Sequence, residues 1–179
     1  HATGDHYRDD AIRQAMEHQA QLALRPGPVR VDVIVDPPWS DGQINSVQVV
    51  TGDRPFLVDT VASCLLRHGW RVEDVRHPII GVKRDRGTIE AVGMPGRGGC
   101  ASESWIHIDA TAPLGTDIGQ AAEQLRDDLC ACLDQVVCAT DDWGAMHEAM
   151  LRTAELVSAS SGPADDRDSS RELLEWLAD

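Results

Sequence analysis

The chain is poor in aromatic and in basic side chains. Phe, Tyr and Trp together make up 4% of its 179 residues, and only one Phe and one Tyr are among them. Asp and Glu number 30 against 16 Lys and Arg, so the formal net charge is −14. RNA-binding sheets stack bases on exposed aromatic rings, and nucleic acids and anionic membranes attract basic protein faces. The composition therefore argues against nucleic acid and membrane surfaces as partners.

Long apolar runs and a paired set of cysteines are also missing. No apolar run approaches the ~20 residues of a membrane-spanning helix, and the start of the chain shows no signal-type pattern. The cysteines are odd in number and scattered: Cys64, Cys100, Cys130, Cys132 and Cys138. Disulfide frameworks use even numbers of cysteines in secreted proteins. We therefore expect reduced thiols in a cytoplasmic protein.

The first third of the chain shows one helix pattern and one strand pattern. Apolar spacing predicts a helix over 7–24, and two prolines end it. The face expected to be buried consists of Ile12, Ala15, Met16, Ala20 and Ala23. Alternating valines predict a strand over 29–36, which we expect at a sheet edge or paired with another chain.

The centre of the chain predicts a strand that leads through a turn into a helix. The β-branched stretch 45–51 is the strand, and Gly52–Pro55 forms the turn. We expect Asp53 to cap the helix, which runs to about Arg67 and ends at Gly69.

The following segments predict three extended stretches, a helix and a final strand. Residues 70–83 are extended, with Pro78 at an edge or bulge, and a hairpin turn at 84–87 leads into a return strand over 88–94. The remaining elements are a strand over 103–110, a helix over 117–132 and a strand over 133–139.

This order predicts an α+β fold of the ferredoxin-like type, a βαββαβ sandwich. Such a fold has an antiparallel sheet with its helices on one face, here with flanking helices added. We expect an N-terminal helical segment at 1–28, the ferredoxin-like domain at 29–139, a C-terminal helix packed on it at 140–159, and a linker with the start of a further domain at 160–179.

The two C-terminal helices are expected on either side of a polar linker. The first begins near Trp143, and its apolar stripe includes Met146 and Met150. A polar linker over 158–169 follows, and Ser169–Glu172 fits a capping box that opens an apolar second helix.

The stretch Gly52–Asp59 is the best candidate for a ligand site. Free N–H groups at a helix start can hold a carboxylate, and Asp53 and Asp59 could meet an ammonium group. Alternatively, Asp53 only caps the helix, while Phe56 and Val58 fill the core. Both interpretations remain open at this point.

Metal and nucleophile motifs are weak. Cys130 and Cys132 stand two apart on the expected helix, roughly 200° around its axis, so both sulfurs cannot easily reach one ion. No local signature joins Cys64 to His77 or His107 as a nucleophile and its base. We expect no catalytic residue and no metal ligand in this chain.

Several short motifs, in order, resemble the N-terminal region of the large bacterial NAD-specific glutamate dehydrogenases. They are Thr51–Thr60, Arg67–Gly69, His77–Pro78, Lys83–Gly87 and Glu103–Ile108, followed by Asp142–Met146 and Leu173–Asp179. The resemblance covers nearly the whole chain and implies the first ACT-type domain of a very long enzyme. The catalytic domain that binds NAD lies elsewhere in that family, so the resemblance implies no bound cofactor and no catalytic residue here.

ACT-type domains commonly bind amino acids where their first strand meets their first helix. The resemblance places such a site at Asp53, Arg54, Pro55, Phe56 and Leu57. Amino-acid-sensing ACT domains often carry Gly after the proline of this turn, whereas Phe56 stands there in this chain. A bulky ring at that position would fill space that a ligand needs.

The function expected from this resemblance is regulation or assembly without catalysis. The parent enzyme would oxidise glutamate to 2-oxoglutarate with NAD. Its other domains, a second copy of the chain and an amino-acid effector are the expected partners. The alternative is a free-standing amino-acid sensor of the ACT type.

Overall fold

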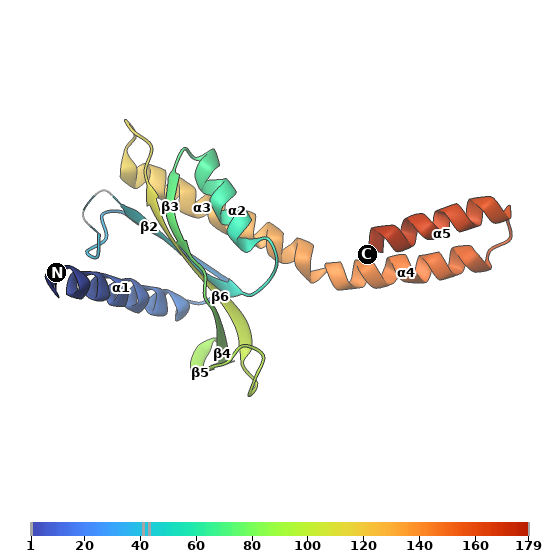
Figure 1. The fold of residues 1–179 in the computed structure, drawn as a ribbon, viewed down its shortest axis with the longest axis horizontal. Coiled ribbons are helices and arrows are strands. Elements are labelled where there is room, and N and C mark those ends of the chain that lie inside the picture. The colour runs from blue at the N-terminus through green and yellow to red at the C-terminus, as the bar shows by residue number, and fades with distance from the viewer. Residues whose placement is uncertain (1, 41, 43, 179) are drawn as a thin grey trace. The chain divides into compact units, whose positions relative to one another are not determined.

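The computed structural model describes residues 2–40, 42 and 44–178, with side chains from residue 9 onward. Eleven elements follow one another along the chain: α1 Ala2–Ala23, β1 Val29–Ile34, β2 Asn45–Gly52, α2 Leu57–Arg67, β3 Arg71–Arg76, β4 Ile79–Asp85, β5 Thr88–Gly93, β6 Ala101–Thr111, α3 Ile118–Asp141, α4 Trp143–Ala159 and α5 Ala164–Ala178 (Figure 1). They divide into two compact units, residues 1–136 and 137–179.

The first unit is built on a single antiparallel sheet. Its strand order is β1-β2-β6-β4-β5, and β3 pairs with β6 on the same side as β4. β2 and β3 both run antiparallel to β6 and are joined by α2, so β2-α2-β3 is a split βαβ unit with β6 between its strands. The expected α+β class, with an antiparallel sheet and helices, is confirmed.

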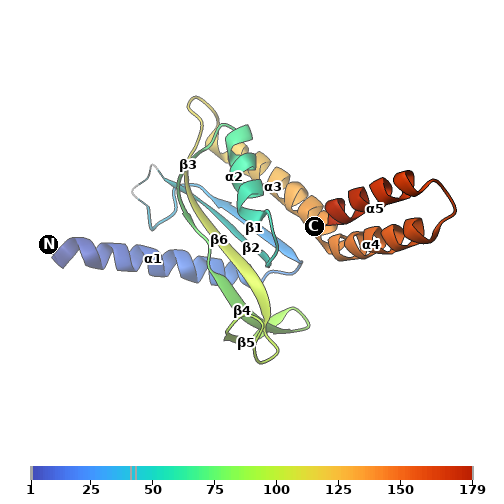
Figure 2. The ribbon, with the colours of Figure 1, turned by 45° about the vertical axis from the view of Figure 1, so that its right-hand side comes forward.

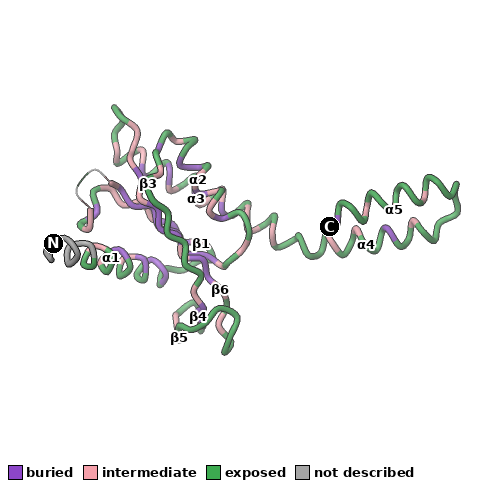
Figure 3. Tube along the Cα trace, in the orientation of Figure 1, coloured by how far each residue is buried: buried purple, intermediate pink, exposed green. Residues whose placement is uncertain are grey.

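The helices α2 and α3 cover one face of this sheet, and α1 lies on the opposite face (Figures 1 and 2). Alternating residues of β2 and β6 point toward α2 and α3, so this face is apolar. The buried core on this side includes Val47, Val49, Ile106, Ile108, Leu57, Val61, Leu65, Leu125, Leu129 and Leu133. Buried residues concentrate in the same strands and helices in Figure 3.

The prediction of a strand over 133–139 is wrong, because α3 continues as a helix to Asp141. Leu125, Leu129 and Leu133 repeat every four residues and are fully buried, so the helical stripe extends past the expected end. The β-branched pair Val136–Val137 carried the strand pattern but lies within this helix. The edge beside β2, where the last strand of a βαββαβ unit would pair, is occupied by β1.

The N-terminal helix is confirmed, but its expected buried face is only partly right. Ala15 and Ala23 are buried, whereas Ile12 and Met16 are 50% and 64% exposed. Gln19 takes a buried place instead and donates to the carbonyl of Ile106 at 2.9 Å. The middle of the helix lies on polar residues of the sheet, so a polar residue points inward there, while Leu22 and Ala23 near its end pack with Val50.

The extended stretch 70–83 is broken at His77–Pro78 into β3 and β4, which pair with successive parts of β6. The carbonyl of Pro78 still accepts a hydrogen bond from the Trp105 amide at 3.0 Å. The predicted hairpin joins β4 to β5 through Arg86 and Gly87, whose φ angles of 47° and 88° are those of a type I′ turn.

The second unit is a hairpin of two helices, α4 and α5. The prediction of a polar linker over 158–169 is wrong, because α5 already begins at Ala164, directly after Pro163. Asp165 and Asp166 lie in the first turn of α5. Acidic side chains are favourable at a helix start, which explains the earlier beginning. The capping box expected at Ser169 therefore lies inside α5. The domain division expected at 28, 139 and 159 stays a prediction.

Gly81→Ala should destabilise the first unit. A Cβ at Gly81 would overlap the backbone carbonyl of Met94, which cannot move without disturbing the strands. Overpacking of this kind typically costs about 1–3 kcal/mol, and urea unfolding followed by circular dichroism would measure it. Gly52→Ala is the control, because its Cβ would make an ordinary contact with Arg54 at 3.5 Å. Equal midpoints for both variants would contradict the close approach at Gly81.

Candidate functional site

The turn between β2 and α2 is anchored to β6 through Asp53. The Asp53 amide donates to the carbonyl of Ser102 at 2.9 Å. Its carboxylate accepts a hydrogen bond from the Ser104 hydroxyl at 2.6 Å, and Ser104 Oγ also lies 2.9 Å from His77 Nε2. Asp53 is therefore held by a neighbouring strand, and the expectation that it caps α2 is wrong.

The three side chains Asp53, Ser104 and His77 do not form a catalytic triad. In a triad, histidine accepts the serine proton and the acid orients the histidine. Here Asp53 and His77 both contact Ser104 Oγ, and the serine proton points to Asp53. Ser104 is fully buried, so its oxygen is not available to a substrate. The geometry fits a structural clamp at the end of β2.

Phe56 is the N-cap residue of α2 and has an unusual backbone. Its φ of 70° and ψ of 4° are left-handed, and no side chain caps the helix there. A bulky residue rarely adopts this conformation, which glycine accepts freely. The Phe56 ring is 66% exposed, so the expectation that it fills the core is wrong.

The other residues of the expected ligand site have separate environments. Leu57 is buried in the core beneath α2, and Val58 is partly buried against it. Arg54 is partly buried and donates to the Gly52 carbonyl at 3.4 Å, whereas Pro55 is exposed. The structure thus brings Asp53 to β6 but directs Phe56 outward and Leu57 inward. The amino-acid site at these five positions stays a prediction.

Thr51 adds a polar group at this end of β2 that the sequence did not single out. Its hydroxyl is fully buried and has no hydrogen-bond partner among the described residues. Thr51 stands opposite Ser104 in the β2–β6 register. The strand pattern already placed Thr51 last in the β2 stretch, but its missing partner is visible only in three dimensions.

A second polar cluster lies on the other face of the sheet, beneath α1. His107 is buried; its Nδ1 lies 3.2 Å from Gln48 Nε2, and its Nε2 lies 3.0 Å from Asp109 Oδ1. Gln48 also donates to the Ala15 carbonyl at 3.0 Å, which fixes α1 on the sheet. Arg76 donates to the other oxygen of Asp109 at 3.0 Å. Side chains alternate along β6, so His107 and Trp105 share a face, but the partners in this network come from distant parts of the chain.

The surroundings of Asp109 lower the pKa of its carboxyl and so favour the ionised form. Burial raises the pKa of its carboxyl, but the hydrogen bond and charge of His107, together with the charge of Arg76, outweigh burial and bring the pKa below its ordinary value. The network therefore holds a charged carboxylate between two donors.

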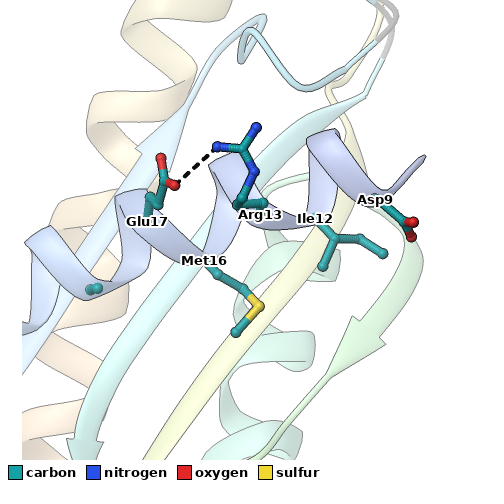
Figure 4. Close-up of a pocket in the computed structure, with 6 residues that line it drawn as sticks. Asp9, Ile12, Arg13, Met16 and Glu17 are labelled. Carbon is teal, nitrogen blue, oxygen red and sulfur yellow. Dashed lines mark hydrogen bonds and ion pairs between the residues drawn. The ribbon is translucent and has the colours of Figure 1, made fainter. Parts of the chain in front are cut away.

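A cavity of about 260 Å³ opens between α1 and the sheet. Most of its lining is apolar; the residues are Ile12, Ala15, Met16, Gln19, Ala20, Arg76, Pro78, Ile80, Trp105 and His107. Figure 4 shows a separate pocket on α1, where Ile12 and Met16 project from one side of the helix, while Arg13 and Glu17 form an ion pair at 3.3 Å on another side. Ile12, Met16 and Ala20 of the apolar stripe predicted for α1 thus border this cavity between α1 and the sheet, whereas Ala23 of the same stripe is fully buried.

Two observations bear on metals and membranes. Among the residues that the structure describes, no group of three or more His, Cys, Asp and Glu is arranged to hold a metal ion. Within the same residues, every helix is too short or too polar to cross a membrane.

Asp109→Asn should destabilise the chain at neutral pH by about 1–3 kcal/mol, as loss of a hydrogen bond to a charged group does. A carboxyl whose pKa is lowered by folding stabilises fully above its unfolded pKa of about 3.9, and this stability is lost as the pH falls through the folded pKa. The difference from the unmodified chain should therefore vanish in acid. Urea unfolding at pH 7 and at a series of decreasing acidic pH values measures both effects.

Asp74→Asn is the matched control. Asp74 also pairs with Arg76, at 2.6 Å, but its side chain is 53% exposed. Exposed ion pairs contribute at most about 1 kcal/mol. If both variants lose the same stability, the buried network does not hold Asp109 as described.

The comparison with known families agrees with this fold. Residues 5–129 match the glutamate dehydrogenase ACT1 domain family. The matched stretch contains the complete sheet, α2 and half of α3, and it spans more than two thirds of the chain. The resemblance to the N-terminal ACT-type domain of glutamate dehydrogenase is thereby confirmed. The chain belongs to the glutamate dehydrogenase ACT1 domain family.

Proposed function

We propose that this chain is a non-catalytic regulatory and assembly domain of an NAD-specific glutamate dehydrogenase. The parent enzyme converts glutamate and NAD to 2-oxoglutarate, NADH and ammonium on a separate catalytic domain. This domain contributes no residue to that reaction and binds no nicotinamide. It acts in the cytoplasm by docking against other domains of its parent chain and against further copies of the enzyme.

The hairpin of α4 and α5 carries this proposal, because it lacks a core of its own. Among its described residues, only Ala154 and Ala178 are buried. Trp143 is 57% exposed and Trp176 is 73% exposed. Met146, Leu156, Leu173 and Leu177 are also largely exposed.

A helix pair with so little buried apolar surface has little to hold it together. Isolated helices of this length are marginal in water, and most helical stability in proteins comes from packing of an apolar face. Burial of a Trp, Leu or Met side chain contributes roughly 1.5–3 kcal/mol each. A protein surface that covers Trp143 and Trp176 would supply this missing stabilisation, and another domain of the parent chain is such a surface.

The alternative, an amino-acid sensor, is favoured by one observation. The unpartnered hydroxyl of Thr51 and the carboxylate of Asp53 lie near the start of α2. An amino acid could direct its carboxylate to the free N–H groups of α2 and its ammonium group to Asp53. The exposed, left-handed Phe56 stands at the same turn, which makes assembly the better-supported function.

Trp143→Ala should weaken assembly of the full-length enzyme that carries this domain. Removal of a large apolar contact from an interface commonly weakens association tenfold or more, and sedimentation analysis at several concentrations would measure it. The control is Leu114→Ala, because Leu114 is 99% exposed and lies outside the hairpin. Assembly and stability that both remain unchanged in Trp143→Ala would remove the docking role of α4.

Calorimetric titration of the chain with a panel of amino acids should give flat traces if docking is its function. Glutamate and aspartate belong to the panel. Saturable binding that is lost in Asp53→Ala would establish the sensor function instead. Asp53→Asn is the control for folding, because its amide oxygen can still accept the Ser104 hydrogen bond while its charge is gone.

A further inference from the structure

Two cysteines from different helices meet at one guanidinium group in the first unit. Cys64 lies in α2 and Cys132 in α3. Arg67 Nη2 is 3.5 Å from Cys64 Sγ and 3.3 Å from Cys132 Sγ. The two sulfurs therefore share a single nitrogen atom as a neighbour.

A second contact shows that α2 and α3 face each other at this point. His68 Nε2 lies 2.7 Å from Asp128 Oδ2. His68 follows Cys64 by one helical turn, and Asp128 precedes Cys132 by one turn. The two contacts thus repeat along an antiparallel seam, as residues i and i+4 do on facing helices. The pairing of Cys64 with Cys132 belongs to this packing.

The two thiols differ in exposure. Cys64 is 1% exposed, whereas Cys132 is partly exposed. Burial raises the pKa of the Cys64 thiol, and the neighbouring Cys132 raises it further. The Cys132 sulfur beside the Arg67 cation is the accessible one. The thiolate is the nucleophile in disulfide exchange, and an external disulfide reaches the accessible sulfur first.

We propose that Cys64 and Cys132 are a redox-active pair, which closes into a disulfide between α2 and α3 by exchange with a low-molecular-weight disulfide such as oxidised glutathione. The Cys132 thiolate attacks one sulfur of oxidised glutathione, forms a mixed disulfide and releases one glutathione thiolate. The Cys64 thiolate then attacks the Cys132 sulfur and releases the second. The protein loses two electrons and two protons, and both glutathiones leave as thiols.

The other cysteines serve as internal controls. Cys130 lies two positions before Cys132, roughly 200° around the α3 axis, so it points away from this seam. Cys138 is exposed and lies nearly two turns farther along α3. Neither shares the Arg67 guanidinium in the contacts that the structure records.

The test is incubation of the folded chain with oxidised glutathione, followed by acid quenching, proteolysis and mass spectrometry without reduction. The expected product is one peptide pair joined through Cys64 and Cys132, which dithiothreitol separates. Cys132→Ser should abolish this pair and Cys138→Ser should leave it unchanged. Arg67→Gln should slow its formation several-fold, because the cation beside the thiols is lost.

Cys64→Ala gives a second, independent result. With the resolving thiol gone, Cys132 should retain one glutathione. Circular dichroism before the reaction verifies that each variant is folded. The proposal is overturned if the unmodified chain stops at glutathionylated Cys132, or if Cys64 is linked to Cys130 and Cys138 as often as to Cys132. It is also overturned if the folded chain does not react.

Discussion

The pairing of β6 with three other strands holds the first unit together. β2 pairs along one side of β6, while β3 and β4 pair with successive parts of its other side. Side chains alternate along β6, so Ile106 and Ile108 enter the apolar core while Trp105 and His107 face α1. A shift of one residue in this register would exchange the two faces and bury the charged network where α2 and α3 now pack.

The same register determines what lies at the start of α2. Thr51 stands opposite Ser104, and Ser104 holds Asp53 in place. With Asp53 fixed to β6, the chain must turn within three residues to begin α2 at Leu57, and Phe56 adopts the left-handed conformation that this turn demands. The exposed Phe56 ring is thus a consequence of the anchored strand. A ligand bound at this turn would lie next to the Phe56 ring.

The sequence predicted those elements whose patterns are local. β2, α2, β6 and the β4–β5 hairpin each had a repeat and a clear stop signal, and the structure confirms them. The predictions were wrong where a residue far away in the chain determines the partner or the burial of a side chain. Asp53 had the spacing of a cap, but Ser104 binds its carboxylate. Ile12 and Met16 had the spacing of a buried face, but polar contacts of Ala15 and Gln19 hold the middle of α1 on the sheet. The Thr51 hydroxyl and the Cys64–Cys132 pair depend on residues far apart in the chain, so no spacing could indicate them.

Residues 133–139, which were predicted to form the last strand, belong to α3 and connect the sheet to the helices that follow. A sheet of the βαββαβ type needs a strand at the edge beside its first strand, and here β1 occupies that edge before the unit begins. Because the edge is filled, the chain after Leu133 does not return to the sheet, and α3 continues as a helix to Asp141. The same helix that completes the core therefore also leads into α4, where Trp143, the residue of the proposed docking contact, is exposed. The proposed disulfide between Cys64 and Cys132 would fix α3 to α2 about two and a half turns before α3 ends at Asp141, so a change of redox state in the core would act on the helix that leads into α4.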